Sequence, residues 1–251
     1  SRERLMNVVR DELVEIQGRY GDTRRTEILS NAFDLTDEDL ITPTDMVVTL
    51  SYSGYAKAQP VADYQSQRRG GKGRIATRNK DEDFVRTMFV ANSHDTILCF
   101  SSAGKVYWLK VYQLPQAGRH ARGRPLVNLL PLEQEERITA FLPLGEYPAG
   151  HFIFMATRSG TVKKCAISNF SKPRSTGLRA IELTDNDELV GVDLTTGTSD
   201  VLLFGSTGKA IRFHQKEGRE LGRTARGVRG IALKSGPVSY THLTLPTNRE
   251  V

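Results

Sequence analysis

The stretch best suited to chemistry is a seven-residue run in which three cations lie among three glycines, Gln67-Arg68-Arg69-Gly70-Gly71-Lys72-Gly73. Arg and Lys supply positive charge and hydrogen-bond donors for phosphate, and glycine lets the backbone approach another polymer closely. The run, called the box below, lies within a segment from Ser66 to Lys80 that holds six basic residues and no acid. A solvated basic linker has the same composition, so the segment alone leaves linker and phosphate-binding site open.

The elements that must hold the box show a fourfold internal repeat. Four apolar runs each lead into a small-residue turn with one glycine, and these turn glycines are 50, 56 and 48 residues apart. A glycine turn between two apolar runs predicts a β-hairpin. The apolar runs are residues 46–51, 96–101, 152–157 and 201–206, and the turn glycines are Gly54, Gly104, Gly160 and Gly208.

The second half of each unit repeats as well, since another glycine follows and an arginine comes one or two positions later. Further apolar runs predict third strands at 126–130 and 180–183 and fourth strands at 138–142 and 189–194. Four strands in a repeat of about 50 residues are typical of a propeller blade, so we predict a mainly β disc. Turn and bulge geometry alone could explain the glycines, but less readily where arginine accompanies them. These second glycines are Gly73, Gly123, Gly177 and Gly227, with Arg74, Arg124, Arg179 and Arg229.

Charge follows the same repeat. Residues 104–132 hold five basic residues and no acid, residues 158–180 hold six and no acid, and acids gather at 81–83, 133–136 and 185–188. A property that recurs once per blade falls at the same place on every blade, which predicts a basic band along one side of the disc with the acids elsewhere. Such a band suits a bent polyanion. Charge that serves only solubility would intersperse the two signs.

Composition excludes several other classes. The chain has 251 residues and a formal net charge of +6, and no apolar stretch approaches the roughly 20 residues of a membrane span. No signal peptide is visible, and Ser1 stands in mid-pattern, which indicates a piece of a longer chain.

Cys99 and Cys165 lie in apolar runs and are predicted to be core residues in a reducing cytoplasm, not a disulfide or metal pair. The five histidines show no ligand spacing, so no metal site is predicted.

Before the repeats, apolar residues at three-to-four spacing predict a helix over residues 2–20, with Gly21 at its C-terminal cap. We predict four parts. They are residues 1–22, the end of a helical arm; 23–43, a linker; 44–236, a partial disc of about four blades whose last blade is incomplete; and 237–251, an unrelated tail, expected to be artefactual.

The box resembles, at all seven positions, the motif that marks the A subunit of bacterial DNA gyrase. The resemblance covers about residues 1–235 and implies a β-pinwheel, a propeller-like disc with exchanged strands and normally six blades, after the end of a coiled-coil arm. Other segments that fit the family are 21–28, 39–42, 98–102, 122–125 with 128–132, and 227–231.

The resemblance also implies a function. The disc of this family binds and wraps double-stranded DNA for an ATP-dependent type II topoisomerase that introduces negative supercoils. We predict that Arg68, Arg69 and Lys72 of the box hold one end of the wrap. The remaining phosphate contacts would come from an arginine track, made of Arg74, Arg119, Arg122, Arg124, Arg174, Arg179, Arg226 and Arg229.

The resemblance does not extend to the family's breakage-reunion region with its tyrosine nucleophile, so we expect no catalytic residue in this chain and assign none. No Walker A motif exists, because Lys72 is followed by Gly73 and Ser66 stands where the first glycine would be. The chain alone is therefore expected neither to cut DNA nor to hydrolyse ATP, and to bind no cofactor. ATP and Mg²⁺ would be handled by the gyrase B subunit, in an A2B2 holoenzyme, and by the missing N-terminal region, in the bacterial cytoplasm at the nucleoid and away from membranes.

Two alternatives stay open. The first is a domain like that of topoisomerase IV, which selects DNA crossings without wrapping and in which the box is degraded or absent. The second is a propeller scaffold that binds proteins, with salt-insensitive partner binding and little affinity for DNA. A free-standing enzyme fits least, since no nucleophile–base pair or metal set is visible in the sequence.

Overall fold

The computed structural model describes residues 2–23, 25–26, 37–64, 83–118, 121–206 and 208–232. The chain divides into two compact units, Ser1–Leu40 and Ile41–Val251. The box, Arg74, Arg119 and residues 237–251 lie outside the described residues.

The first unit contains helix α1 (Arg2–Tyr20) and a short 3₁₀ helix, η1 (Asp37–Leu40). The apolar spacing predicted this helix correctly, and it ends where Gly21 donates its N–H to the carbonyl of Gln17 at 2.8 Å. No residue of α1 is buried, and Leu5 is 65% exposed. No described helix is long and apolar enough to cross a membrane.

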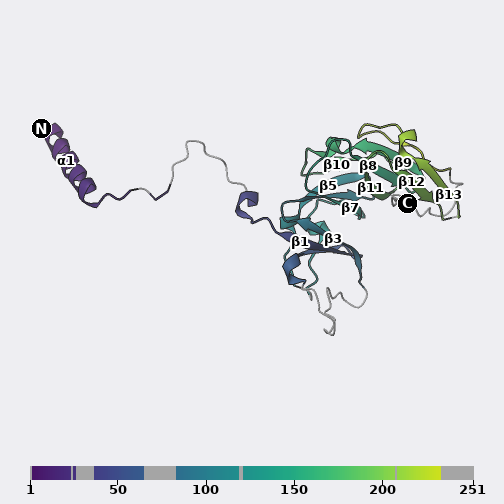
Figure 1. The fold of residues 1–251 in the computed structure, drawn as a ribbon, viewed down its shortest axis with the longest axis horizontal. Helices are drawn as coiled ribbons and strands as arrows, with labels where there is room; N and C mark the ends of the chain where they lie inside the picture. The colour runs from purple at the N-terminus through teal and green to yellow at the C-terminus, as the bar shows by residue number, and fades with distance from the viewer. Residues whose placement is uncertain are drawn as a thin grey trace, which may run out of the picture. The chain divides into compact units, whose positions relative to one another are not determined.

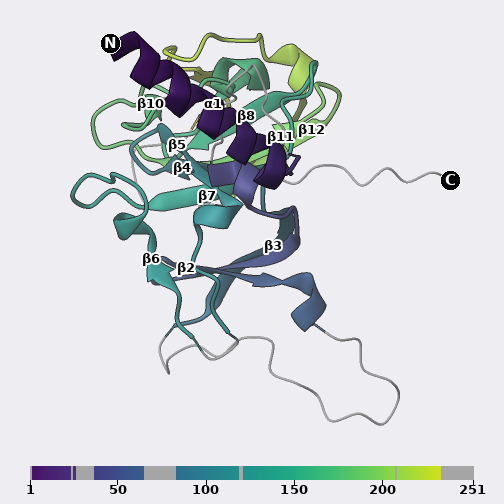
Figure 2. The same ribbon diagram turned by 90° about the vertical axis from the view of Figure 1, so that its left-hand side faces the viewer.

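The second unit is built from antiparallel sheets, which we call blades (Figures 1 and 2). Its described residues form three four-stranded sheets and one two-stranded sheet. The mainly β, propeller-like fold is thereby confirmed. Blade 1 contains β1 (Asp45–Ser51), β2 (Tyr55–Pro60) and β3 (Val85–Asn92); blade 2 contains β4 (Thr96–Ser101), β5 (Lys105–Lys110) and β7 (Ile138–Leu144); blade 3 contains β8 (Phe152–Thr157), β9 (Thr161–Ala166) and β11 (Leu189–Thr195); blade 4 contains β12 (Asp200–Phe204) and β13 (Ala210–His214).

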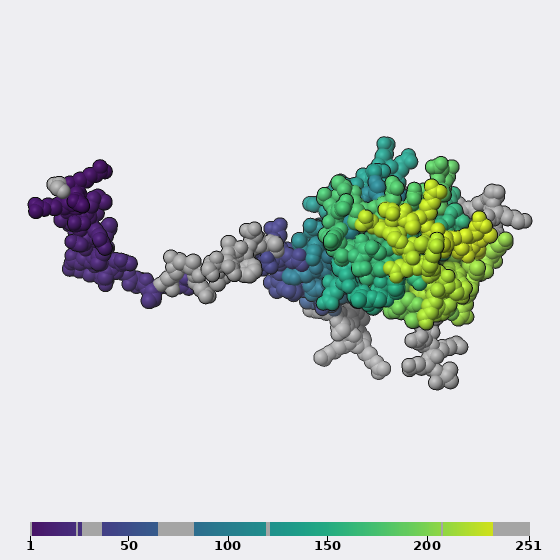
Figure 3. Space-filling view, turned by 90° about the horizontal axis from the view of Figure 1, so that it is seen from above, coloured from purple at the N-terminus to yellow at the C-terminus, as the bar shows by residue number. Residues whose placement is uncertain are grey.

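Each of the first three blades takes its outermost strand from the following repeat. These exchanged strands are two residues long: β6 (Arg124–Pro125) pairs with β2, β10 (Leu178–Arg179) with β5, and β14 (Val228–Arg229) with β9. Figure 2 shows β6 beside β2, and in Figure 3 the yellow C-terminal part of the described chain lies against the green third repeat. Exchange agrees with the pinwheel that the resemblance implied.

The third strands predicted at 126–130 and 180–183 are wrong in position. Residues Leu126–Asn128 form a 3₁₀ helix, η4, and the exchanged strands end just before each predicted run. The apolar residues of those runs are buried for another reason: Leu126 and Ile181 join the cores between blades. The fourth strands are confirmed as β7 and β11.

The turn glycines are confirmed. Gly54, Gly104 and Gly160 have φ of 81°, 72° and 87°, and each donates its N–H to the carbonyl three residues earlier, at 3.1, 3.0 and 3.0 Å. Gly208 has φ of 79°. Positive φ costs glycine little, so the hairpins close at these positions. Each second hairpin strand then runs into a 3₁₀ helix, namely η2 (Val61–Asp63), η3 (Val111–Gln113), η5 (Ile167–Phe170) and η6 (Gln215–Glu217).

The hydrophobic cores lie between neighbouring blades. Alternate residues of one strand enter different cores: in β4, Ile97 and Cys99 pack toward blade 1, while Leu98 and Phe100 pack toward blade 3. A strand buried on both faces has a continuous apolar sequence, which explains the four apolar runs. Cys99 and Cys165 are buried free thiols in these cores, as predicted.

Candidate nucleic-acid interface

The exchanged segments carry the described part of the arginine track. Arg124, Arg179 and Arg229 lie in the exchanged strands themselves, and Arg122 and Arg226 lie directly before the second glycines. Arg174 lies in the loop before β10, where its carbonyl accepts from Gly177 at 3.0 Å. All six side chains belong to exposed residues, whereas the structure does not describe the box, Arg74 or Arg119.

The second glycines are needed for strand exchange. Gly123, Gly177 and Gly227 have φ of 86°, 75° and 106°. A Cβ on Gly177 would lie 2.5 Å from the ring of Tyr107, one on Gly227 would lie 2.5 Å from the carbonyl oxygen of Val162, and one on Gly123 would overlap a carbonyl of blade 1. These glycines therefore recur because the exchanged segment must cross the preceding blade closely.

The exchanged segments dock on the hairpin turns. The carbonyl of Gly54 accepts from Leu126 N at 2.9 Å, that of Gly104 from Ala180 N at 2.8 Å, and that of Gly160 from Gly230 N at 2.9 Å. The segment following each second glycine is thus fixed to the turn of the preceding blade by the same bond. Arginines on these segments recur near the hairpin-turn end of blades 1, 2 and 3.

Arg124 is not equivalent to the other two strand arginines. In the registers, Arg179 lies opposite Lys105 and Arg229 opposite Thr161, but Arg124 lies opposite Ala56, one position further along the strand. Since side chains alternate across a strand, a shift of one residue turns a side chain to the other face. The difference in register follows from the sequence, because Arg124 is one residue from its glycine whereas Arg179 and Arg229 are two residues from theirs.

Arg122 and Arg226 are equivalent, and each has a different neighbour. The Arg122 guanidinium lies 4.2 Å from the ring centroid of Tyr55, a cation–π contact that orients it. Arg226 Nε lies 3.9 Å from a carboxylate oxygen of Glu182. The Arg226–Glu182 ion pair is weak, because it is exposed and long. Since Arg122 and Arg226 are both exposed residues, their guanidinium groups are accessible to an anion.

Acidic residues lie near the same turns, so the predicted separation of signs is incomplete. Asp83 and Asp187 accept from the backbone N–H groups of Ser53 and Ser159, at 3.0 and 2.8 Å, and so cap the hairpin turns. Arg137 pairs with Glu188 at 3.0 Å. The acids have a local structural role that their sequence clustering did not reveal.

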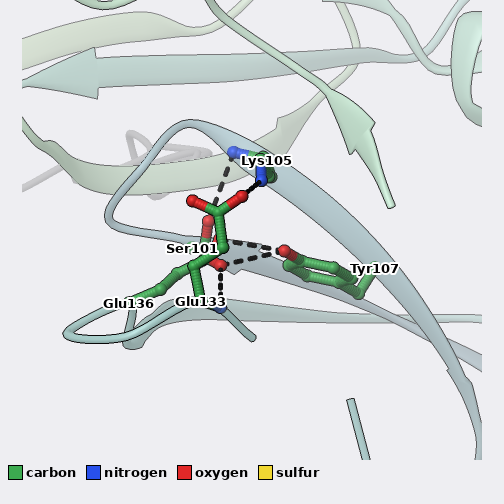
Figure 4. A network of polar contacts seen from close by, with 5 residues as sticks. All are labelled: Ser101, Lys105, Tyr107, Glu133 and Glu136. Atoms are coloured by element: carbon green, nitrogen blue, oxygen red, sulfur yellow. Dashed lines mark hydrogen bonds and ion pairs between the residues drawn. The ribbon is translucent and has the colours of Figure 1, made fainter. Parts of the chain in front are cut away.

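A polar network near the hairpin turn of blade 2 is also structural (Figure 4). The Tyr107 hydroxyl donates to Glu136, 2.9 Å from Oε2, and the same carboxylate oxygen accepts from Glu133 N at 2.8 Å. Lys105 forms an ion pair with Glu133. Burial, and then the bond to Glu136, raise the pKa of Tyr107, which keeps its hydroxyl protonated. Within the described residues no group of three His, Cys, Asp or Glu side chains could hold a metal ion.

Two lysines were not recognised as buried by sequence reasoning. Lys163 is 0% exposed and Lys57 is 3% exposed, although Lys163 was counted in the basic band. Burial lowers the pKa of Lys163 to about 8, and burial also lowers the pKa of Lys57. Each lysine follows a turn glycine by three residues and comes directly after an apolar residue, Ala56 or Val162. This shared position in the repeat is the sequence signal that could have identified both as buried.

A groove of about 240 Å³ lies beside β14, between blades 3 and 4. Its lining includes the basic residues Lys164, Arg219 and Arg229 and the apolar residues Phe154 and Phe213. Glu217 also lines this groove, so both signs of charge are present in its wall.

Blades that exchange their outer strands define a β-pinwheel type of propeller. The family described as the DNA gyrase C-terminal domain, β-propeller, matches residues 45–92, 95–144, 151–196 and 199–238. The chain belongs to this family, and the four matched segments coincide with the four repeats.

The chain is similar to curated relatives along nearly its whole length. It is 58% identical over 246 residues to the DNA gyrase A subunit of Salmonella typhimurium, covering 98% of this chain and 28% of that protein. It is 57% identical over 233 residues to the DNA gyrase A subunit of Haemophilus influenzae, covering 93% and 26%. The chain spans about a quarter of the length of these relatives.

Solved structures show the same fold. The crystal structure of the C-terminal domain of DNA topoisomerase IV matches with a TM-score of 0.71 and 27% identity, covering 83% of this chain and 63% of that one. The structure of the DNA gyrase A C-terminal domain matches with a TM-score of 0.60 and 23% identity, covering 80% and 64%.

Proposed function

We propose that this chain binds and wraps double-stranded DNA as the C-terminal part of a gyrase A polypeptide. The observation that carries the proposal is the return of exposed arginines on exchanged segments docked to successive hairpin turns. The family match and the similarity to DNA gyrase A proteins support it. The work of the chain would be to hold a DNA segment for a negatively supercoiling type II topoisomerase.

Wrapping requires many phosphate contacts. Bending a 20–30 bp site by 40–90° costs about 1–6 kcal/mol, which the contacts must offset. Each phosphate neutralised by Arg or Lys releases counterions and contributes about −0.9 to the slope of log affinity against log salt. Arginine holds a phosphate through two parallel N–H donors, without reading bases. Binding is therefore expected to be strong at low salt and independent of sequence.

The reaction itself would depend on other parts of the enzyme. In this proposal the chain holds no cofactor and no catalytic residue, while ATP and Mg²⁺ act in the gyrase B protein and in an N-terminal region of the gyrase A protein. The assembly would be A2B2 and would work on the bacterial chromosome in the cytoplasm. Arg68, Arg69 and Lys72 of the box would fasten one end of the wrapped segment.

A plasmid ligation assay tests this assignment. Nicked plasmid is closed by ligase in the presence of the protein, and wrapping is measured as a shift in linking number. Replacing Arg68, Arg69 and Lys72 together by alanine is expected to abolish the shift while leaving weak DNA binding from the track. A variant that shifts linking number as the parent does would refute the role of the box.

The match to topoisomerase IV favours a second candidate, a domain that recognises DNA crossings. Such a domain would bind plasmid but would leave the linking-number distribution without a preferred sign after ligation. The same assay therefore separates the two candidates.

A further inference from the structure

Lys57 and Lys163 occupy equivalent positions in blades 1 and 3. Each stands three residues after a turn glycine and one residue after the position that pairs with the exchanged strand, Ala56 in blade 1 and Val162 in blade 3. Both side chains are buried at the junction between blade and exchanged segment. In blade 2 the equivalent residue is Tyr107, whose ring lies directly against Gly177 of the exchanged segment.

The amino groups of both lysines hold backbone carbonyls of the exchanged segments. Lys163 Nζ donates to the carbonyl of Ala180 at 2.7 Å and to that of Arg223. Lys57 Nζ donates to the carbonyl of Ala121 at 3.0 Å and lies 3.4 Å from that of Gly118. Ala121 directly precedes Arg122, and Arg223 lies three residues before Arg226.

Burying these amines costs free energy. A buried ammonium group without a compensating carboxylate is unfavourable, and the described residues form no ion pair with Lys163. An apolar residue of similar volume would avoid this cost but would leave two carbonyls without their donor. They are that of Arg223, in the segment docked on blade 3, and that of Ala180, which follows β10 in the segment docked on blade 2. The lysine therefore fixes the backbone conformation of the exchanged segment just before its arginine.

We propose that Lys57 and Lys163 are positioning residues for DNA binding, which fix the exchanged segments so that Arg122 and Arg226 project toward the DNA backbone. The inference rests on the proposed function. Neither lysine needs to touch DNA, because both are buried. Lys57 acts on Arg122 through the backbone of Ala121, and Lys163 acts on Arg226 through the backbone of Arg223.

Lys163→Met in the whole chain tests the inference. Methionine has a similar volume and a side chain one atom shorter, and it cannot donate to the two carbonyls. We expect hydrogen exchange at the Gly230 and Ile231 amides to accelerate at least about tenfold, since the segment loses its tether while the core stays packed. We expect the slope of log DNA affinity against log salt to become shallower by about 0.9–1.8, for one or two lost phosphate contacts. Lys216→Met, which removes an equal charge from an exposed residue of η6, is the matched control and should change neither quantity.

A double-mutant cycle separates positioning from general destabilisation. If Lys163 acts through the arginines, Lys163→Met has no further effect on DNA affinity when Arg179, Arg226 and Arg229 are already alanine, since the Ala180 carbonyl directly follows Arg179. Equal losses in both backgrounds would overturn the proposal. If Lys163→Met does not fold, the same cycle is measured with Lys57→Met and Arg122→Ala. Lys57→Met is then expected to have no further effect on DNA affinity when Arg122 is already alanine.

The outcomes also distinguish the inference from the function on which it rests. An unmodified chain that does not bind duplex DNA contradicts the proposed function. An unmodified chain that binds DNA, together with a folded Lys163→Met variant of equal affinity and salt slope, overturns only the positioning role.

Discussion

At the residue scale, the position of a charge in the strand register decides what it can contact. Arg179 and Arg229 share one register position, and Arg124 occupies the neighbouring one. Arginines that share a face can follow one DNA backbone, whereas a residue on the other face of the strand cannot join them without bending the segment.

Single substitutions test this difference. Arg179→Ala is expected to make the salt slope of DNA affinity shallower by about 0.9, the loss of one phosphate contact. Arg124→Ala is expected to change the slope by less, because its side chain projects from the opposite face. Titrations of a fluorescent duplex at several salt concentrations measure both. Equal changes in the two variants would contradict the assignment from register.

The buried amine of Lys163 links stability to pH. Burial lowers its pKa from 10.5 to about 8, so between pH 8 and 10.5 the unfolded chain binds more protons than the folded chain. The free energy of unfolding contributed by Lys163 therefore rises with pH across this interval. The difference in unfolding free energy between the parent and Lys163→Met, measured by urea denaturation at pH 7, 8, 9 and 10, is expected to shift in favour of the parent as pH rises. A difference that stays constant or shifts the other way would count against the buried, depressed amine.

At the element scale, the exchanged strand is the feature that sequence patterns reveal least. It is two residues long and pairs with a strand of the preceding repeat, as Arg124 does with Ala56, so it has no periodicity of its own to detect. The hairpins, β7, β11 and the core cysteines could be predicted, because long apolar runs and glycine turns are local signals. The apolar run that begins at Leu126 predicts a strand that the structure does not contain, because burial between blades also selects apolar residues.

The exchange depends on its glycine. Gly227 has φ of 106°, and a Cβ there would lie 2.5 Å from the Val162 carbonyl oxygen. Gly227→Ala is expected to destabilise the protein by about 1–3 kcal/mol, the cost of holding a side chain in this backbone region. Gly222→Ala is the control, since a Cβ there has open space and φ is not positive. Thermal unfolding of both variants gives the comparison, and equal melting temperatures would exclude a strained exchange.

For the molecule as a whole, stability and binding are both distributed over the repeats. Each core lies between two blades, and each exchanged segment joins a repeat to the one before it. The candidate site has the same organisation, with two exposed track arginines described on each exchanged segment. The repeat period and the arginines were visible in the sequence. The ion pairs of the acids and the burial of Lys57 and Lys163 depend on contacts between distant segments, and so could not be foreseen.

The most direct test of phosphate binding by successive blades is the salt dependence of DNA affinity when Arg122, Arg179, Arg226 and Arg229 are all replaced by alanine. The account predicts that the slope of log affinity against log salt becomes shallower by about 0.9 for each lost contact, or about 3.6 in all. It also predicts an unchanged melting temperature, since all four residues are exposed. A folded variant that keeps the slope of the parent chain would contradict the account.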